Sequence, residues 1–229
     1  MKTVLITGAD RGIGFALAEK FLQEGYRVLC GQFMPEWNEL AALKEDFPDT
    51  LHLLPMDVGN TASVQEACAR SRNIAEKIDI LINCAGIASG QDTEEMVYAT
   101  MNVNAVGALR VTETFLPMMQ SGMKRICFVS SEAGSIAQAH RTDNFAYCMS
   151  KSALNMAVRL MFQRLRPQGY TFRVYHPGWV KSYMMGKLSE QGVYTAKETA
   201  VAAFQEFSGH REHEDVLMMT DVKSEMWAF

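Results

Sequence analysis

The sequence has no excess of basic residues, no long apolar run and no export signal. Its 229 residues include 22 Lys and Arg against 26 Asp and Glu, giving a net charge of −4 and an isoelectric point near 5.8. The absence of a basic stripe argues against nucleic acid as a partner. No apolar run approaches the roughly 18 residues that span a bilayer, which argues against a membrane protein.

The N-terminus and the cysteines point to the same cellular compartment. The first residues, "MKTVLITG", enter a strand pattern directly and lack the layout of a signal peptide. The five cysteines have no zinc-binding spacing. We therefore expect a cytoplasmic protein that keeps its thiols reduced.

Histidines gather at one place near the C-terminus, in the segment "HREHED" at 210–215. His210 and His213 could suggest a metal site. A solvated charged loop is the simpler interpretation of so many charges, and we predict no metal site.

What the sequence does contain is an alternation of apolar strand runs and helical stretches. Continuous apolar runs indicate strands buried on both faces, and the alternation predicts an α/β fold with a parallel sheet between helices. The predicted strands are 3–7, 27–32, 51–56, 78–86, 124–131 and 171–178. The predicted helices are 12–24, 36–46, 61–77, 93–120 and one that carries Tyr147. No linker or repeat is evident, so we predict a single domain over 1–229, with 183–229 forming a substrate lid and C-terminal segment.

A glycine-rich loop, "TGADRGIG" at 7–14, follows the first strand and opens the first helix. Gly8, Gly12 and Gly14 allow a sharp turn and close approach of a ligand. The helix start beyond them offers free N–H groups and a positive dipole end, as a pyrophosphate requires. The spacing is G-x-x-x-G-x-G rather than the commonest dinucleotide fingerprint. A plain tight turn is the alternative.

The end of the second strand bears on the choice of cofactor. An acid there would bind the ribose 2′-hydroxyl of NAD, but the chain has Gln32 followed by Phe33 and Met34. Arg11 in the glycine loop could face a 2′-phosphate. We therefore predict NADP rather than NAD, with an exposed loop charge as the alternative interpretation of Arg11.

Tyr147 and Lys151 stand four residues apart near the start of a helix, which puts both on one face. By themselves they are most simply a surface phenol covering a lysine stem. Their setting in the chain changes that interpretation.

Seven motifs in order carry a family resemblance: "TGADRGIG", "MDVGN" (56–60), "NCAG" (83–86), "MNVNAVG" (101–107), "VSSEAG" (129–134), "YCMSK" (147–151) and "HPGWVKS" (176–182). Over residues 1–182 the chain resembles the classical short-chain dehydrogenase/reductases. "GSIA", "SKSALNM" and "HPGWVKS" further resemble the subgroup of C-factor-like and sniffer-like carbonyl reductases. The resemblance implies a Rossmann-type, doubly wound parallel sheet.

The resemblance also implies roles for individual residues. Tyr147 would be the catalytic acid/base, Lys151 its partner and a ribose ligand, Ser131 the residue that orients the substrate carbonyl, and Asn104 the holder of a water that links Lys151 to solvent. The implied cofactor contacts are Gly8, Asp10, Arg11, Gly12, Ile13, Gly14, Gln32, Asp57, Val58, Asn83, Ala85, Gly86, Tyr147, Lys151, Pro177, Gly178, Val180 and Ser182.

Two regions depart from the family pattern. Tyr147 lies sixteen residues after Ser131, a longer spacing than usual, with the extra residues in "QAHRTDNF". Ser130 is therefore an alternative to Ser131. The segment after Ser182 lacks the glycine pattern of the subgroup, which leaves the substrate class open.

The chemistry of carbonyl reduction gives the Tyr147–Lys151 pair a purpose. A free phenol titrates near pH 10, and a nearby cation lowers an acid's pKa by roughly 1–3 units. We therefore expect Lys151 to lower the pKa of Tyr147 toward the working pH. Ser131 would donate a hydrogen bond to the substrate oxygen as charge develops.

The predicted function is NADPH-dependent reduction of a ketone or aldehyde to an alcohol, with Tyr147 as proton donor. The alternative is a dinucleotide-sensing or signalling protein of the same fold with little turnover. The expected partners are a small carbonyl or alcohol substrate and further copies of the chain, as a homodimer or homotetramer.

Overall fold

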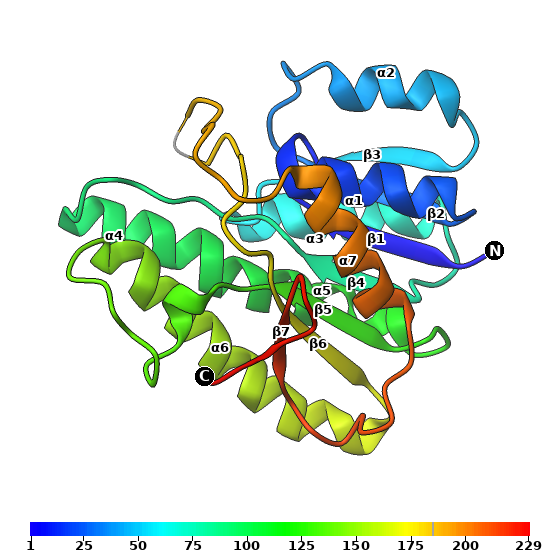
Figure 1. Cartoon of the computed structure of the whole chain (residues 1–229). Coiled ribbons are helices and arrows are strands. Elements are labelled where there is room, and N and C mark those ends of the chain that lie inside the picture. The colour runs from blue at the N-terminus through cyan, green and yellow to red at the C-terminus, as the bar shows by residue number, and fades with distance from the viewer. Residues whose placement is uncertain (185) are drawn as a thin grey trace.

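The chain folds around one eight-stranded sheet with helices on both faces (Figure 1). The computed structural model describes residues 1–184 and 186–229. The strand order is β3-β2-β1-β4-β5-β6-β7-β8, and all neighbours are parallel except β7 and β8. The strands are β1 Thr3–Thr7, β2 Arg27–Gln32, β3 Leu51–Pro55, β4 Ile80–Asn83, β5 Arg125–Val129, β6 Thr171–His176, β7 Met219–Asp221 and β8 Met226–Trp227.

The two faces of the sheet are covered by different helices. The helices are α1 Gly12–Gln23, α2 Glu39–Asp46, α3 Thr61–Arg72, α4 Glu94–Met101, α5 Ala108–Met119, α6 Phe145–Leu165 and α7 Ala196–Ser208. In β1, Val4 and Ile6 pack into the apolar cluster of α1, α2 and α7, whereas Leu5 between them packs into the cluster of α3, α5 and α6. Short 3₁₀ turns are η2 Glu132–Gly134 and η3 Arg166–Gln168.

The predicted α/β architecture and its six strands are confirmed, with differences at element ends. The run 78–86 yields only the four residues of β4, because the amides of Cys84 and Ala85 turn to Thr7 Oγ1 at 3.0 and 3.1 Å. The predicted helix 93–120 is interrupted by a π-helical stretch, η1 Asn102–Gly107. Such stretches occur often at functional sites.

Residues 196–229 contain three elements that the sequence patterns did not predict. Helix α7 packs beside α1 on the sheet, and its start has a capping box between Thr195 and Glu198. Strand β7 extends the sheet beside β6, and β8 closes the edge. Within the expected lid and C-terminal segment, residues 196–229 therefore form part of the helical layer and of the sheet. Met185 of that segment lies outside the described residues.

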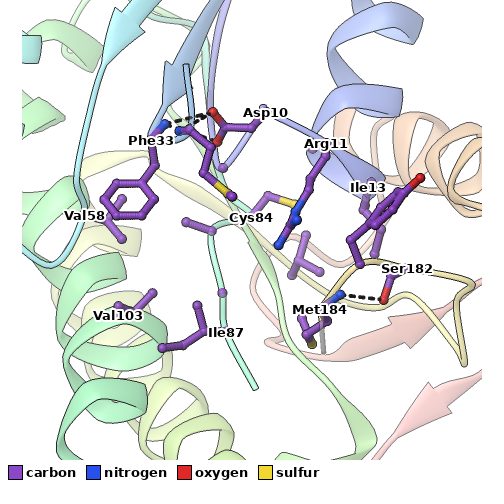
Figure 2. A pocket seen from close by; sticks show the side chains of 18 of the residues that line it. Asp10, Arg11, Ile13, Phe33, Val58, Cys84, Ile87, Val103, Ser182 and Met184 are labelled. Carbon is purple, nitrogen blue, oxygen red and sulfur yellow. Dashed lines mark hydrogen bonds between the residues drawn. The ribbon is translucent and has the colours of Figure 1, made fainter. Parts of the chain in front are cut away.

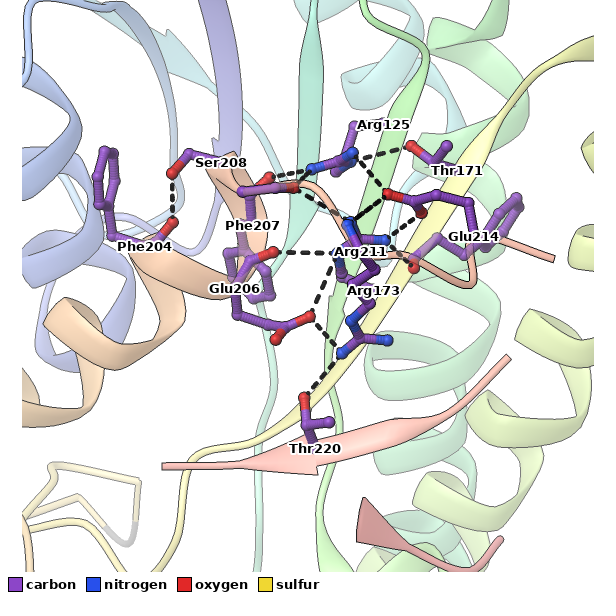
Figure 3. Close-up of polar contacts among 12 residues, drawn as sticks. Arg125, Thr171, Arg173, Phe204, Glu206, Phe207, Ser208, Arg211, Glu214 and Thr220 are labelled. Atoms are coloured by element: carbon purple, nitrogen blue, oxygen red, sulfur yellow. Dashed lines mark hydrogen bonds and ion pairs between the residues drawn. The ribbon is translucent and has the colours of Figure 1, made fainter. Parts of the chain in front are cut away.

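The prediction of a solvated loop at 210–215 is wrong for two of its residues. Arg211 and Glu214 join Arg125, Arg173 and Glu206 in a network of ion pairs and hydrogen bonds (Figure 3). Arg173 donates twice to Glu214, at 2.6 Å each, and its side chain is only 1% exposed. The network fixes the segment after α7 against β5 and β6 because buried guanidinium groups require anionic partners.

Candidate active site

A cavity of about 260 Å³ opens at the carboxyl edge of the sheet, where β1, β2, β4, β5 and β6 end. This edge is where parallel α/β sheets bind ligands. Fourteen of the eighteen predicted cofactor contacts line the cavity: Gly8, Asp10, Arg11, Gly12, Ile13, Gly14, Asp57, Val58, Ala85, Gly86, Tyr147, Lys151, Pro177 and Ser182.

The glycine loop has no room for side chains at two positions. A Cβ on Gly8 would come within 2.7 Å of Ala85 Cα, and the φ of Gly8 is +63°. A Cβ on Gly14 would come within 2.1 Å of the Gly8 carbonyl oxygen. The loop therefore keeps its backbone exposed to the cavity. Arg11 makes no side-chain capping bond at the start of α1 in the described structure, so the amides there are open to a ligand.

Asp10 holds the end of β2 in place. Its carboxylate accepts hydrogen bonds from the backbone amides of Phe33 and Met34 at 2.9 and 2.8 Å (Figure 2). The single acid of the loop is thus engaged by backbone donors. The ends of β1 and β2 are tied together where an adenosine ribose would lie.

Arg11 lines the cavity (Figure 2), and its guanidinium lies over two aromatic rings. Its guanidinium carbon lies 4.8 Å from the centre of the Trp37 ring and 5.6 Å from that of Tyr183. The two rings meet edge to face with centroids 4.9 Å apart. These cation–π contacts connect three chain segments: the glycine loop, the segment after β2 and the segment after Ser182.

Tyr147 and Lys151 both line the cavity from α6. Lys151 Nζ lies 5.6 Å from the centre of the Tyr147 ring and donates to the Val129 carbonyl at 2.9 Å. The helix start is held from outside, because Asp92 accepts a hydrogen bond from the Ala146 amide at 2.9 Å. The pair is therefore not a surface phenol with a lysine beneath it.

The expectation that Lys151 lowers the pKa of Tyr147 is wrong for this structure. Burial is the largest influence and raises the pKa of Tyr147 to about 12, while hydrogen bonding to Ser131 opposes the rise. Burial also lowers the pKa of Lys151 to about 8. Removal from water disfavours both charged forms. The phenol is therefore protonated at neutral pH in the cofactor-free protein.

The two neighbouring serines point in different directions. Ser130 Oγ is buried and donates to Asn155 Oδ1 at 2.6 Å, and Ser130 lines the cavity, whereas Ser131 is not among the lining residues. Ser131 lies beside the Tyr147 phenol, whose pKa it lowers by hydrogen bonding, although burial acts more strongly. The long spacing before Tyr147 therefore does not displace Ser131 from the phenol.

Asn104 lies in the π-helical stretch, and its side chain fixes the backbone next to the cavity. Its amide accepts from the Ile87 N–H and donates to the Ile87 carbonyl, both at 2.8 Å. It also donates to Ser150 Oγ at 3.0 Å, one residue before Lys151. Asn104 thus joins the segment after β4 to the helix of Tyr147.

Four predicted contacts are not among the residues that line the cavity: Gln32, Asn83, Gly178 and Val180. Gln32 is paired with Pro55 of β3, and Asn83 donates to Thr112 at 3.2 Å. The wall also includes residues that were not predicted as cofactor contacts: Phe33, Met34, Met56, Cys84, Ile87, Val103, Val129, Ser130, Tyr183 and Met184. Most are apolar and lie close in sequence to a predicted contact. Their position near the ends of predicted strands was the signal that could have identified them.

No helix in the part of the chain that the structure describes is long and apolar enough to cross a membrane. Residues 1–184 and 186–229 contain no cluster of three or more His, Cys, Asp or Glu that could hold a metal ion.

Comparison with known proteins agrees with this geometry. Residues 2–192 match the family model described as short chain dehydrogenase. The C-signal protein of Myxococcus xanthus is 43% identical over 115 residues, which cover 48% of this chain and 69% of that protein. The NADPH-bound carbonyl reductase from chicken fatty liver is 28% identical, with a TM-score of 0.90 over 100% of this chain and 99% of that one. The Drosophila melanogaster carbonyl reductase Sniffer shares the fold, with a TM-score of 0.91 at 24% identity over 100% of both chains. The chain belongs to the short-chain dehydrogenase/reductase family of NAD(P)-dependent oxidoreductases.

Proposed function

We propose that the protein reduces a ketone or aldehyde to an alcohol with NADPH, and that Tyr147 donates the proton. The observation that carries the proposal is the position of Tyr147 and Lys151 in the same cavity as the glycine loop. A hydride source and a proton source would then face one substrate carbonyl. Similarity to the NADPH-bound carbonyl reductase from chicken supports this direction of reaction.

The residues present fit a nicotinamide dinucleotide. Side chains at Gly8 and Gly14 would clash with Ala85 and with the Gly8 carbonyl, so these glycines allow the loop to turn tightly, while a Cβ on Gly12 would meet open space. The start of α1 would hold the pyrophosphate through its amides, Asp57 and Val58 the adenine, and Lys151 the nicotinamide ribose. When bound, NADPH supplies the hydride.

Preference for NADPH follows from the charges at the ribose end. The Arg11 guanidinium lies over Trp37 and Tyr183 and can pair with a 2′-phosphate. The carboxylate of Asp10 is turned to the amides of Phe33 and Met34 rather than offered to a ribose hydroxyl. This arrangement supports NADP over NAD.

The proton transfer belongs to this chain's own residues. The substrate carbonyl carbon gains a hydride from NADPH, and its oxygen gains the proton of the Tyr147 hydroxyl. The phenolate left behind regains a proton from water by way of the Lys151 ammonium, in a path that Asn104 helps to fix. The burial that raises the pKa of Tyr147 favours the protonated starting state.

We also propose that the protein, a single domain, self-associates through α6. Its outer face exposes Phe145, Met149, Met156 and Leu160. Apolar side chains gathered along one helix are typical of surfaces that pair with another protein. Light scattering over a range of concentrations would show a dimer or tetramer rather than a monomer.

A dinucleotide-sensing or signalling protein is the second candidate, favoured by similarity to a protein named C-signal. One assay separates the two. The purified protein is mixed with NADPH and a panel of aldehydes, quinones and diketones, and NADPH absorbance and alcohol product are both followed. Turnover with product equal to NADPH consumed supports the reductase. Tight NADPH binding without turnover across the panel would favour the sensor.

A further inference from the structure

Arg11 lies against an aromatic pair that comes from two other parts of the chain. Its guanidinium carbon is 4.8 Å from the centre of the Trp37 ring and 5.6 Å from the centre of the Tyr183 ring. The two rings contact each other with an angle of 69° between their planes. In the part of the chain that the structure describes, the Arg11 side chain forms no capping bond at the start of α1, and its guanidinium contacts rings rather than a carboxylate.

A guanidinium that lies over a ring keeps its hydrogen-bonding edge available. The planar group carries five N–H donors around its rim, whereas an aromatic ring packs against its face. Cation–π attraction therefore fixes the position of the charge without using its donors. A phosphate can accept two parallel hydrogen bonds from that edge. The contacts of Arg11 thus leave it suited to bind the 2′-phosphate of NADPH.

Trp37 is itself positioned by the glycine loop. Its backbone amide donates to the Met34 carbonyl at 3.1 Å, which closes a turn with Pro35 at its second position. The Met34 amide in turn donates to Asp10 Oδ1 at 2.8 Å. Asp10 directly precedes Arg11 in the chain. The turn after β2 is therefore bonded to one residue of the glycine loop, and its tryptophan contacts the next.

The two rings differ in how firmly they are tied to Arg11. Trp37 is the nearer ring, and its turn is hydrogen-bonded to the glycine loop through Asp10. Tyr183 is farther from the guanidinium and comes from the segment after Ser182, on the other side of the cavity's sequence motifs. Trp37 is therefore the ring that the contacts connect most directly to the position of Arg11.

Resting on the proposed use of NADPH, we propose that Trp37 is a specificity-determining residue that positions Arg11 for the 2′-phosphate. A long side chain loses conformational freedom when it binds a ligand, and an arginine already fixed by a ring loses less. Trp37 thus raises the affinity for the cofactor that carries the phosphate, and it does so only through Arg11. NADH lacks the phosphate and gains nothing from the contact.

The test is a double-mutant cycle on cofactor binding. Trp37→Leu removes the ring, Arg11→Ala removes the charge, and a third variant carries both changes. Titration calorimetry measures the affinity of each protein for NADPH and for NADH. Trp37→Leu should lower NADPH affinity about threefold to tenfold and leave NADH affinity unchanged. In the Arg11→Ala protein, the same substitution should have no further effect on either affinity.

Two single variants serve as controls. Trp37→Phe keeps an aromatic face and should lose less NADPH affinity than Trp37→Leu. Tyr98→Leu removes an exposed ring on α4 and should change neither affinity. Because NADH affinity is measured in every variant, it also reports whether the cofactor site is still folded.

Three results would overturn the role of Trp37 alone, in a wild type that prefers NADPH. The first is an unchanged NADPH affinity in Trp37→Leu. The second is an equal loss for NADPH and NADH, as expected if the ring stacks on adenine instead. The third is the same loss of NADPH affinity with and without Arg11. Equal affinity of wild type for both cofactors would contradict the proposed use of NADPH, and the role of Trp37 with it.

Discussion

Lys151 carries a stability cost that comes from its position. Burial lowers its pKa from 10.5 to about 8, with the nearby Cys84 opposing the change. Between these two values the unfolded chain binds more protons than the folded one, so stability rises with pH there. The cost is fully present below about pH 8 and disappears above 10.5. Lys151, to which we assign a role in the reaction, thus destabilises the cofactor-free protein at neutral pH.

Lys151→Met should therefore stabilise the cofactor-free protein at neutral pH. The free energy of unfolding should rise by on the order of 3 kcal/mol because the desolvation cost is removed. Loss of the hydrogen bond to Val129 offsets about 1 kcal/mol of this rise. Urea denaturation across pH should show the difference shrinking above pH 8, and NADPH affinity should fall. Lys223→Met, an exposed control, should change neither. A stability difference that does not vary with pH would refute the cost assigned to Lys151.

Arg11→Ala should remove most of the preference for NADPH. A charge-assisted contact contributes about 1.5–3 kcal/mol, so NADPH affinity should drop about tenfold to a hundredfold while NADH affinity changes little. Titration calorimetry with both cofactors measures this. Arg72→Ala, at the exposed end of α3, is the matched control. Equal losses for NADPH and NADH would mean that Arg11 does not contact the 2′-phosphate.

At the scale of elements, the start of α6 depends on a residue from another segment. Asn144 precedes the helix with φ +63° and forms no side-chain cap in the described structure. Asp92, from the segment after β4, accepts the Ala146 amide instead. This bond is the largest cause of a lowered Asp92 pKa. The cap is therefore present above the unfolded pKa of 3.8 and lost as pH falls through the lower folded value.

Asp92→Ala should loosen the first turn of α6 and move Tyr147. We expect faster hydrogen exchange at the Ala146 amide and a several-fold loss of turnover with a higher KM, because the segment beside the cavity is released as well. Asp92→Asn keeps a hydrogen-bond acceptor for the Ala146 amide and should therefore lose less turnover than Asp92→Ala. Asp143→Ala removes an exposed acid near the same helix end and serves as control. Unchanged exchange at Ala146 would show that the cap is unimportant.

The C-terminal elements depend on the buried arginines. Glu214 pairs with Arg173 and Arg125, whose side chains are 1% and 2% exposed. Removing its charge leaves two buried cations short of an anion. Glu214→Gln should lower the free energy of unfolding by about 3 kcal/mol, as measured by urea denaturation.

The same ion pairs set an acid limit. Arg173 helps to lower the pKa of Glu214 below 4.5, although burial, the larger influence, opposes it. This stabilisation is present above pH 4.5 and is lost as pH falls through the folded value. Glu212→Gln, two residues away and exposed, should have little effect. Similar effects of both variants would contradict the role given to Glu214.

At the scale of the whole molecule, sequence patterns were most informative for features that depend on residues close together in the chain. The six strand runs from Thr3 to His176 and the glycine loop could be predicted because periodicity and turn residues act over a few positions. The position of Ser131 beside Tyr147, as opposed to Ser130, needed the fold, because both serines follow one strand.

What the sequence could not show depends on contacts between distant segments. Strand β7 has only three residues and is held by the packing of the C-terminal segment, so it has little periodic signal. Arg211 and Glu214 look like solvated charges until Arg125 and Arg173 are placed beneath them. The direction of the Tyr147 pKa shift depends on burial, which spacing along a helix does not measure.

The most direct test of the account is single-turnover reduction by wild type and Tyr147→Phe. The variant removes only the hydroxyl, so folding and NADPH affinity should be nearly unchanged. Exposed Tyr98→Phe is the control. With a carbonyl reduced by wild type, the account predicts one alcohol formed per NADPH consumed and a loss of rate by at least about 10²-fold in Tyr147→Phe alone. Equal rates in wild type and Tyr147→Phe, at equal NADPH occupancy, would show that Tyr147 is not the proton donor.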